Sequence, residues 1–197
     1  MRNEVRIVGG EWRSRRIRFV PRDGLRPSPD RVRETLFNWL GQDLTGLACL
    51  DLFAGSGALG FEAASRGASR VVMVENDRRA FDALVTNRAA LQAGQVELIR
   101  TDALEFLRCD KGLYDVIFVD PPFGAGYRPR LVPLLPPRMA ASAWVYFESG
   151  ERPDWPEDWE VYREGRAGQV TYQLLKRAQH GAHRGLSGDV RSDHAGS

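Results

Sequence analysis

The chain has 197 residues, of which 43% are hydrophobic and 27% charged, and its formal net charge is +2. This length suits one domain with small attachments, and the composition is that of an ordinary globular protein. No segment approaches the roughly 18 consecutive apolar residues of a membrane span, and no apolar leader follows the first residues. Two unpatterned cysteines support neither a disulfide framework nor a metal site. We therefore expect a cytoplasmic monomer that binds no metal and no membrane.

Positive charge is concentrated near the N-terminus. Residues 1–33 contain ten arginines and four acidic residues, a net charge of +6, which leaves −4 on the rest of the chain. These arginines alternate with apolar residues, which favours a folded segment over a solvated arm. Arginine presents a planar fork of donors that suits phosphate. We expect residues 1–25 to be a basic attachment that binds RNA through Arg6, Arg13, Arg15, Arg16 and Arg18; a merely solvated face is the alternative.

The first elements are a predicted β-hairpin over residues 4–19 and a helix over residues 28–40. In the hairpin, two alternating runs flank Gly9-Gly10, and glycine tolerates the positive φ of a two-residue turn. In the helix, Ser28 suits the N-cap, Pro29 the first helical position, and Asp30 the positive end of the dipole.

From about residue 47 the pattern alternates between strand and helix. Such alternation predicts a mostly parallel, doubly wound α/β sheet that binds its ligand at the carboxyl ends of the strands. We expect an antiparallel strand to close it, within a Rossmann-like domain over residues 26–177. The predicted strands are 47–53, 70–75, 96–100, 114–119, 143–148, 157–164 and 169–177, and the predicted helices are 58–66, 78–91, 103–108 and 131–135.

The last residues, 178–197, are expected to be disordered because Gly, Ser, Ala and His dominate them. This segment holds all three histidines of the chain. A disordered histidine cannot be held within hydrogen-bond reach of a reacting atom. The sequence therefore excludes a Ser-His-Asp or Cys-His hydrolase and disfavours a histidine-ligated metal.

A glycine-rich turn follows the first predicted strand of the sheet. Residues 51–60 read Asp-Leu-Phe-Ala-Gly-Ser-Gly-Ala-Leu-Gly, and an acidic residue, Glu75, lies twenty positions beyond Gly55. Glycines let the backbone approach a ligand closely, and a carboxylate after the second strand can accept hydrogen bonds from ribose hydroxyls. A tight turn without a ligand is the simpler alternative. The cofactor contacts expected here are Asp51, Phe53, Gly55, Ser56, Gly57, Glu75 and Asn76.

The acid at the start of this turn bears on which cofactor binds. Nicotinamide dehydrogenases share the glycine pattern, but the Asp51 carboxylate would repel a pyrophosphate and attract a cation. S-adenosylmethionine (SAM) carries a sulfonium and an ammonium and no phosphate. The pattern also resembles the first motif of Rossmann-like methyltransferases. In such enzymes an acid after the third strand, here Asp102 followed by Ala103, accepts a hydrogen bond from adenine; a helix N-cap is an equally good interpretation of Asp102.

The motif that favours a particular chemistry is Asp120-Pro121-Pro122-Phe123, directly after a predicted buried strand. Two consecutive prolines remove two donors and stiffen the turn, which is a poor arrangement for stability alone. A rigid turn that carries one carboxylate and one aromatic ring could hold a planar base. Asp120 and the Pro121 carbonyl would accept the two N–H groups of an exocyclic amine, and Phe123 would stack on the flipped base. Adenine N6 and guanine N2 fit this turn equally well.

Together these motifs resemble the bacterial methyltransferases that modify guanine N2 in small-subunit ribosomal RNA. The resemblance covers the chain up to about Lys176 and rests on residues 6–10, 26–38, 51–57, 120–123 and 167–170. Residues 26–38 are the most specific of these segments. Two positions depart from the family pattern, since Pro29 replaces a usual Ser or Thr and Ser14 a common Gly, which leaves the contacts of that loop open.

The resemblance implies a function and further contacts. It implies that the helix over residues 28–40 packs over the cofactor, with Arg31 or Arg33 near the SAM carboxylate, and that the partner is small-subunit ribosomal RNA or an assembling 30S particle. An N6-adenine methyltransferase acting on DNA or RNA remains an alternative. A nucleic-acid-binding module without catalysis is a second one, although the intact glycine turn, Glu75 and Asp120 speak against it.

Overall fold

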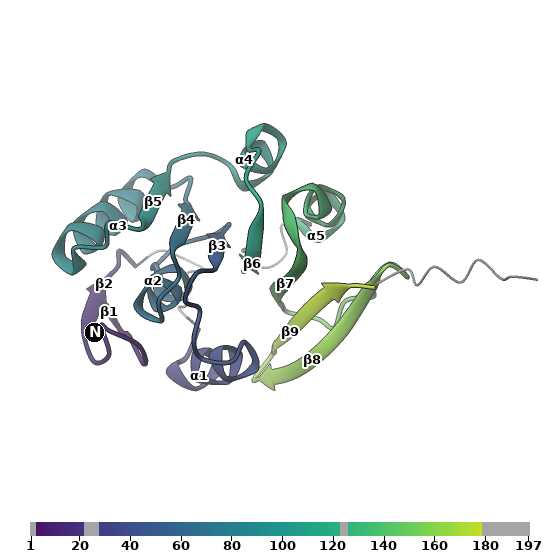
Figure 1. Ribbon diagram of the computed structural model, residues 1–197, viewed down its shortest axis with the longest axis horizontal. Coiled ribbons are helices and arrows are strands. Elements are labelled where there is room, and N and C mark those ends of the chain that lie inside the picture. Colours follow the sequence, from purple (N-terminus) through teal and green to yellow (C-terminus); the bar gives the residue numbers. More distant parts are fainter. Residues whose placement is uncertain (1–2, 22–27, 123–125, 179–197) are drawn as a thin grey trace, which may run out of the picture.

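The computed structural model describes residues 3–21, 28–122 and 126–178 (Figure 1). A seven-stranded sheet has the order β5-β4-β3-β6-β7-β9-β8, and a separate two-stranded sheet pairs β1 with β2. The five strands from β5 to β7 are mutually parallel, while β9 runs antiparallel to both β7 and β8. The predicted fold class, a mostly parallel Rossmann-like sheet with antiparallel closure and an N-terminal hairpin, is confirmed.

The elements follow the predicted order. The strands are β1 (Glu4–Arg6), β2 (Arg16–Arg18), β3 (Ala48–Asp51), β4 (Arg70–Val74), β5 (Val96–Ile99), β6 (Tyr114–Val119), β7 (Met139–Ser149), β8 (Trp159–Ala167) and β9 (Val170–Arg177). The α-helices are α1 (Asp30–Trp39), α2 (Ala58–Ser65), α3 (Arg78–Leu91), α4 (Ala103–Cys109) and α5 (Arg128–Leu131). The helix predicted over residues 131–135 is instead the end of α5 and the 3-10 turn Val132–Leu134, because prolines interrupt this segment.

Helices cover both faces of the sheet, which separates two hydrophobic cores. One core joins α1, α2 and α3 to the sheet, and the hairpin residues Val5, Ile7 and Ile17 are buried in it. The other core contains residues of α4, α5 and the 3-10 turn. None of the helices in the described part of the chain is long and apolar enough to cross a membrane.

The strand order reverses between β3 and β6, where a ligand site is expected in this type of sheet. The chain builds β4 and β5 on one side of β3 and then adds β6 and β7 on the other. Connections leave opposite faces at such a point, so the carboxyl ends of the two strands border a crevice. The segments that follow β3 and β6 are the glycine turn and the Asp-Pro-Pro turn.

The hairpin is confirmed, but the two-residue turn predicted at Gly9-Gly10 is wrong. Val5 pairs with Ile17, so the connection is much longer than two residues. It is held open because the Val8 and Gly9 amides donate to the Glu62 carboxylate of α2 at 2.9 and 2.8 Å. Contacts with a helix, rather than local turn chemistry, therefore set the shape of this loop.

The start of α1 also differs from the prediction. Pro29, not Ser28, is the N-cap residue, and no side chain caps the helix. The Ser28 hydroxyl donates instead to Glu148 Oε1 of β7 at 2.5 Å. The long-range bond to a buried carboxylate takes the hydroxyl away from the local N–H groups that an N-cap would satisfy.

Candidate active site

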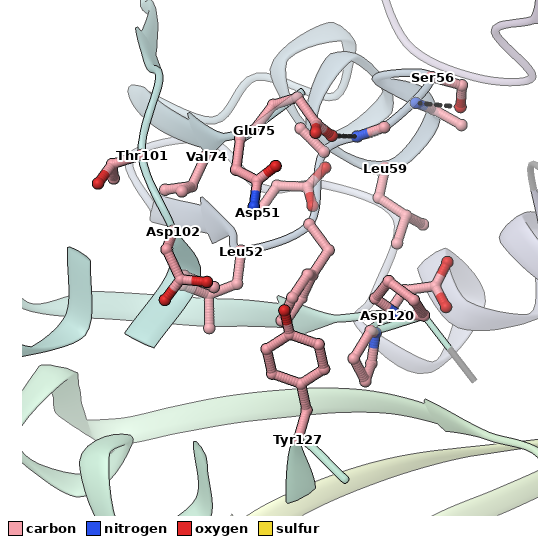
Figure 2. Close-up of a pocket in the computed structure, with 18 of the residues that line it drawn as sticks. Asp51, Leu52, Ser56, Leu59, Val74, Glu75, Thr101, Asp102, Asp120 and Tyr127 are labelled. Atoms are coloured by element: carbon pink, nitrogen blue, oxygen red, sulfur yellow. Dashed lines mark hydrogen bonds between the residues drawn. The ribbon is translucent and has the colours of Figure 1, made fainter. Parts of the chain in front are cut away.

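A cavity of about 510 Å³ opens at the carboxyl ends of the parallel strands (Figure 2). Its size lies in the range of small-molecule and cofactor sites. Segments at the carboxyl ends of four strands line this cavity. These segments are residues 51–56 from the end of β3, 74–76 from the end of β4, 101–103 after β5 and 120–122 after β6.

The glycine turn after β3 shapes the cavity through two different glycines. Gly55 lines the cavity, and its amide donates to Glu75 at 2.8 Å. Gly57 was predicted to contact the cofactor but is not among the lining residues of the described chain. It has φ +81°, and a Cβ there would lie 2.6 Å from Phe61 and 2.8 Å from Leu84. Gly57 is therefore required by the packing of α2 and by its own backbone conformation.

Asp51 is a buried carboxylate at the end of β3. Only 2% of its surface is exposed, and Oδ2 accepts a hydrogen bond from the Gly60 amide at 3.0 Å. Burial raises its pKa to about 7, and the nearby Glu75 adds to the shift, although hydrogen bonds from Gly60 and Phe53 oppose it. An acid held at such an energetic cost is better explained by a cationic ligand than by stability.

Glu75 and Asp102 each organise backbone as well as lining the cavity. The two oxygens of Glu75 accept from the Gly55 and Asp77 amides, both at 2.8 Å. Asp102 is the N-cap of α4 and accepts from the Leu104 and Glu105 amides through one oxygen, Oδ1, at 2.9 and 3.2 Å. The predicted N-cap is therefore confirmed, and lining the cavity is compatible with it. Figure 2 shows both carboxylates around the same space as Asp51.

Asp120 lines the cavity directly after β6, together with Pro121 and Pro122. Within the described residues its carboxylate takes part in no hydrogen bond or ion pair, so both oxygens can accept from a ligand. Burial raises its pKa well above the usual range of an aspartate, and the charges of Glu148 and Asp51 add to this. Phe123, the predicted stacking residue, lies outside the described residues.

Sequence reasoning missed a second carboxylate close to Asp120. Glu148 is the penultimate residue of β7, which lies next to β6 in a register where Val119 pairs with Phe147. It is 5% exposed, and its Oε1 accepts from the Ser28 hydroxyl at 2.5 Å and the Tyr146 hydroxyl at 2.7 Å. Burial raises its pKa, and the two hydroxyls oppose that shift. The signal was present, because Glu148 is an acid at the end of an apolar strand, as Asp51 is.

The remaining predicted cofactor residues fall into two groups. Arg31 is exposed on α1 and is absent from the cavity wall of the described chain, and Arg33 is fully buried elsewhere. The Arg33 guanidinium donates to Glu62 at 3.1 Å and to Asp30 at 2.6 Å, so it ties α1 to α2. The residues that do line the cavity as predicted are Phe53, Ser56, Asn76 and Ala103. Tyr127 also lines the cavity, and its ring packs edge-on against that of Phe53, with the two ring centroids 5.1 Å apart.

A second cavity of about 430 Å³ lies beside the hairpin and shares Ser28 with the first. Arg6, Arg16 and Phe19 belong to its wall. The predicted RNA-binding arginines of the hairpin are all exposed, and several form ion pairs or hydrogen bonds at the protein surface. Arg6 pairs with Asp30, Arg16 and Arg18 lie near Glu4, and Arg15 donates to the Ala90 carbonyl.

The charge of the main cavity identifies the kind of ligand that fits. Its described lining residues include four carboxylates and no lysine or arginine. A pyrophosphate would be repelled, which disfavours a nicotinamide dinucleotide, whereas the sulfonium and ammonium of SAM would be attracted. The residues present therefore fit SAM. Sheet order and cavity together place the chain in the class of Rossmann-like methyltransferases.

Comparison with known proteins gives the family. The chain belongs to the family described as Conserved hypothetical protein 95, whose model matches residues 5–176. It is 42% identical to ribosomal RNA small subunit methyltransferase D of Escherichia coli strain K12, covering 90% of this chain and 92% of that protein. The same-named protein of Haemophilus influenzae is 39% identical, covering 89% and 95%. A solved structure of a candidate methyltransferase of E. coli, yhhF, superposes with a TM-score of 0.79 at 45% identity, covering 88% and 98%.

Proposed function

We propose that this protein transfers a methyl group from SAM to the exocyclic N2 amine of a guanine in small-subunit ribosomal RNA. The observation that carries the chemistry is the Asp120 carboxylate, which faces a cavity for a cationic cofactor and has no protein hydrogen bond among the described residues. The substrate class is supported by the names of relatives such as ribosomal RNA small subunit methyltransferase D.

The residues that line the cavity have different proposed roles. SAM bound here would supply a methyl group already activated by its sulfonium. Asp51 and Glu75, both buried, present negative charge to the cofactor, and Asp102 lies beyond them on the wall. Asp120 accepts one N–H of the target amine and the Pro121 carbonyl accepts the other, which orients the nitrogen lone pair. Asp120 also offsets the positive charge that develops on nitrogen.

The ionisation of Asp120 depends on what occupies the cavity. In the ligand-free protein burial and the carboxylates of Glu148 and Asp51 raise its pKa, which favours the protonated form. A cationic ligand opposes that shift and favours the carboxylate, which is the form that can accept from the amine. Substrate binding is therefore favoured after the cofactor is in place.

The hairpin is the proposed contact with RNA. The ion pairs of its exposed arginines lie at the surface, so they contribute little and can be exchanged for phosphates. The second cavity, with Arg6 and Arg16 on its wall, shares the lining residue Ser28 with the main cavity, so the two cavities are neighbours. A single-stranded loop held on the hairpin could therefore present a flipped base to Asp120.

The test is to incubate the protein and labelled SAM with small-subunit ribosomal RNA, both free and in 30S subunits that lack the modification, and then digest to nucleosides. We expect labelled N2-methylguanosine at a single site, and no label with Asp120→Ala although that variant still binds SAM. Label in N6-methyladenosine, or only in a DNA control, would overturn the assignment of the target atom.

A further inference from the structure

Ser28 is the one described residue that lines both the main cavity and the cavity beside the hairpin. It is 6% exposed and lies two residues before the start of α1. It is also the first described residue after residue 21. Its partner Glu148 is the penultimate residue of β7, and β7 lies next to β6, which Asp120 follows. Ser28 therefore lies at the base-binding end of the cavity, on the side from which RNA would enter.

The hydrogen of the Ser28 hydroxyl is committed to Glu148. Glu148 Oε1 lies 2.5 Å from Ser28 Oγ and 2.7 Å from the Tyr146 hydroxyl. The Tyr146 hydroxyl donates to this oxygen, and burial keeps the pKa of Tyr146 well above its usual range, so the phenol keeps its proton. The Ser28 and Tyr146 hydroxyls both act against the rise in the pKa of Glu148, so they favour its carboxylate form. A carboxylate oxygen only accepts hydrogen bonds, so Oε1 accepts from Ser28 as well. The lone pairs of Ser28 Oγ are then left for the cavity.

A fixed acceptor beside Asp120 matches guanine and mismatches adenine. Guanine presents N1–H, a donor, next to its N2 amine, whereas N1 of adenine next to the N6 amine is an acceptor. Oxygen lone pairs directed at N1–H form a hydrogen bond, but directed at an acceptor nitrogen they repel. The Asp-Pro-Pro turn alone cannot make this distinction, because it contacts only the exocyclic amine.

We propose that Ser28 is a specificity-determining residue that accepts a hydrogen bond from guanine N1–H, and that Glu148 is the positioning residue that fixes the hydroxyl in this orientation. The inference deepens the proposed function and rests on it. It gives a role to the start of the segment 26–38, which the cofactor contacts do not explain.

The test uses small-subunit ribosomal RNA assembled by ligation with either guanine or 2-aminopurine at the methylated position. 2-Aminopurine keeps the N2 amine but has an unprotonated, acceptor N1. We expect wild-type protein to prefer the guanine RNA by roughly 10- to 100-fold in kcat/KM, the scale of losing one buried hydrogen bond and leaving its partner unsatisfied. In Ser28→Ala this preference should fall below about threefold, and Ser28→Thr, which keeps the hydroxyl, should retain it.

The ratio of the two substrates within one variant cancels any loss of SAM binding or of folded protein. Glu148→Leu, which frees the hydroxyl to rotate, should reduce the preference as Ser28→Ala does. A wild-type preference near one, or an unchanged preference in Ser28→Ala or Glu148→Leu, would overturn the inference. If wild-type protein instead forms no N2-methylguanosine on the guanine RNA, it is the proposed function that fails.

Discussion

Replacing Asp51 by asparagine should change how the stability of the ligand-free protein depends on pH. Burial raises the pKa of Asp51 from 3.8 to about 7 in the folded state. As the pH rises between these values, the unfolded chain loses this proton before the folded protein does, so the folded state is progressively destabilised. At about 1.4 kcal/mol per pH unit, Asp51 should lower the free energy of unfolding by about 2 kcal/mol between pH 5.5 and pH 8. Asp51→Asn should lack this loss.

The assay is urea unfolding of the ligand-free wild type and variant at both pH values, with Asp82→Asn, an exposed acid on α3, as a control. The contribution of Glu148 is common to both proteins and cancels in the difference. That of Asp120 cancels only in part, because the charge of Asp51 is one of the causes that raise the pKa of Asp120. SAM affinity of the wild type should rise with pH through about 7, because the ionised acid attracts the cation, and should be flatter in Asp51→Asn. Equal losses of stability in variant and wild type would refute the argument that this acid is buried for its charge.

Other substitutions separate binding, chemistry and packing. Asp120→Ala should leave SAM affinity nearly unchanged, by calorimetry, and cut turnover by roughly a hundredfold or more; near-normal turnover would contradict the mechanism. Glu75→Ala should weaken SAM binding by about 1–3 kcal/mol, and unchanged calorimetric affinity would remove Glu75 from the site. Gly57→Ala should lower the thermal midpoint, because its Cβ would collide with neighbouring side chains, and wild-type stability would disprove that clash. Replacing four hairpin arginines together should weaken RNA binding and flatten its dependence on salt concentration, while SAM affinity stays unchanged. The four are Arg13, Arg15, Arg16 and Arg18. An unchanged salt dependence would mean that these arginines are only a solvated face.

The fold and much of the candidate site could be predicted from the sequence because their signals are local. Alternation of apolar strands with helices specifies a parallel sheet, and carboxyl ends of parallel strands share one edge. Acids that follow three of those strands were therefore expected together, and Asp51, Asp102 and Asp120 do line one cavity. The two glycines of the turn could not be told apart in the sequence, because the contacts of Gly57 come from Phe61 and Leu84 packed beneath it.

What the sequence could not supply are contacts between distant segments. The predicted N-cap role of Ser28 follows from local propensity, yet its hydroxyl bonds Glu148, 120 positions away. Likewise the glycine pair at residues 9 and 10 is typical of a tight turn, but amides of that loop bond Glu62 instead. In each case a buried carboxylate on another element offered a stronger, charge-assisted partner than the local backbone did.

The same reasoning explains why Arg33, an arginine of the basic N-terminal segment, is buried away from the wall of the main cavity. Its fully buried guanidinium pairs with Glu62, which is also fully buried, and donates to the Arg6 carbonyl of β1 at 2.7 Å. A buried pair is strongly destabilised when one partner is lost, because the other charge remains without compensation. Glu62 thus joins the hairpin, α1 and α2 into one unit, and the hairpin arginines are held at a fixed distance from the cavity. The charge excess of this segment therefore has two parts, since Arg33 joins the hairpin to the core, whereas the exposed arginines are those proposed to contact RNA.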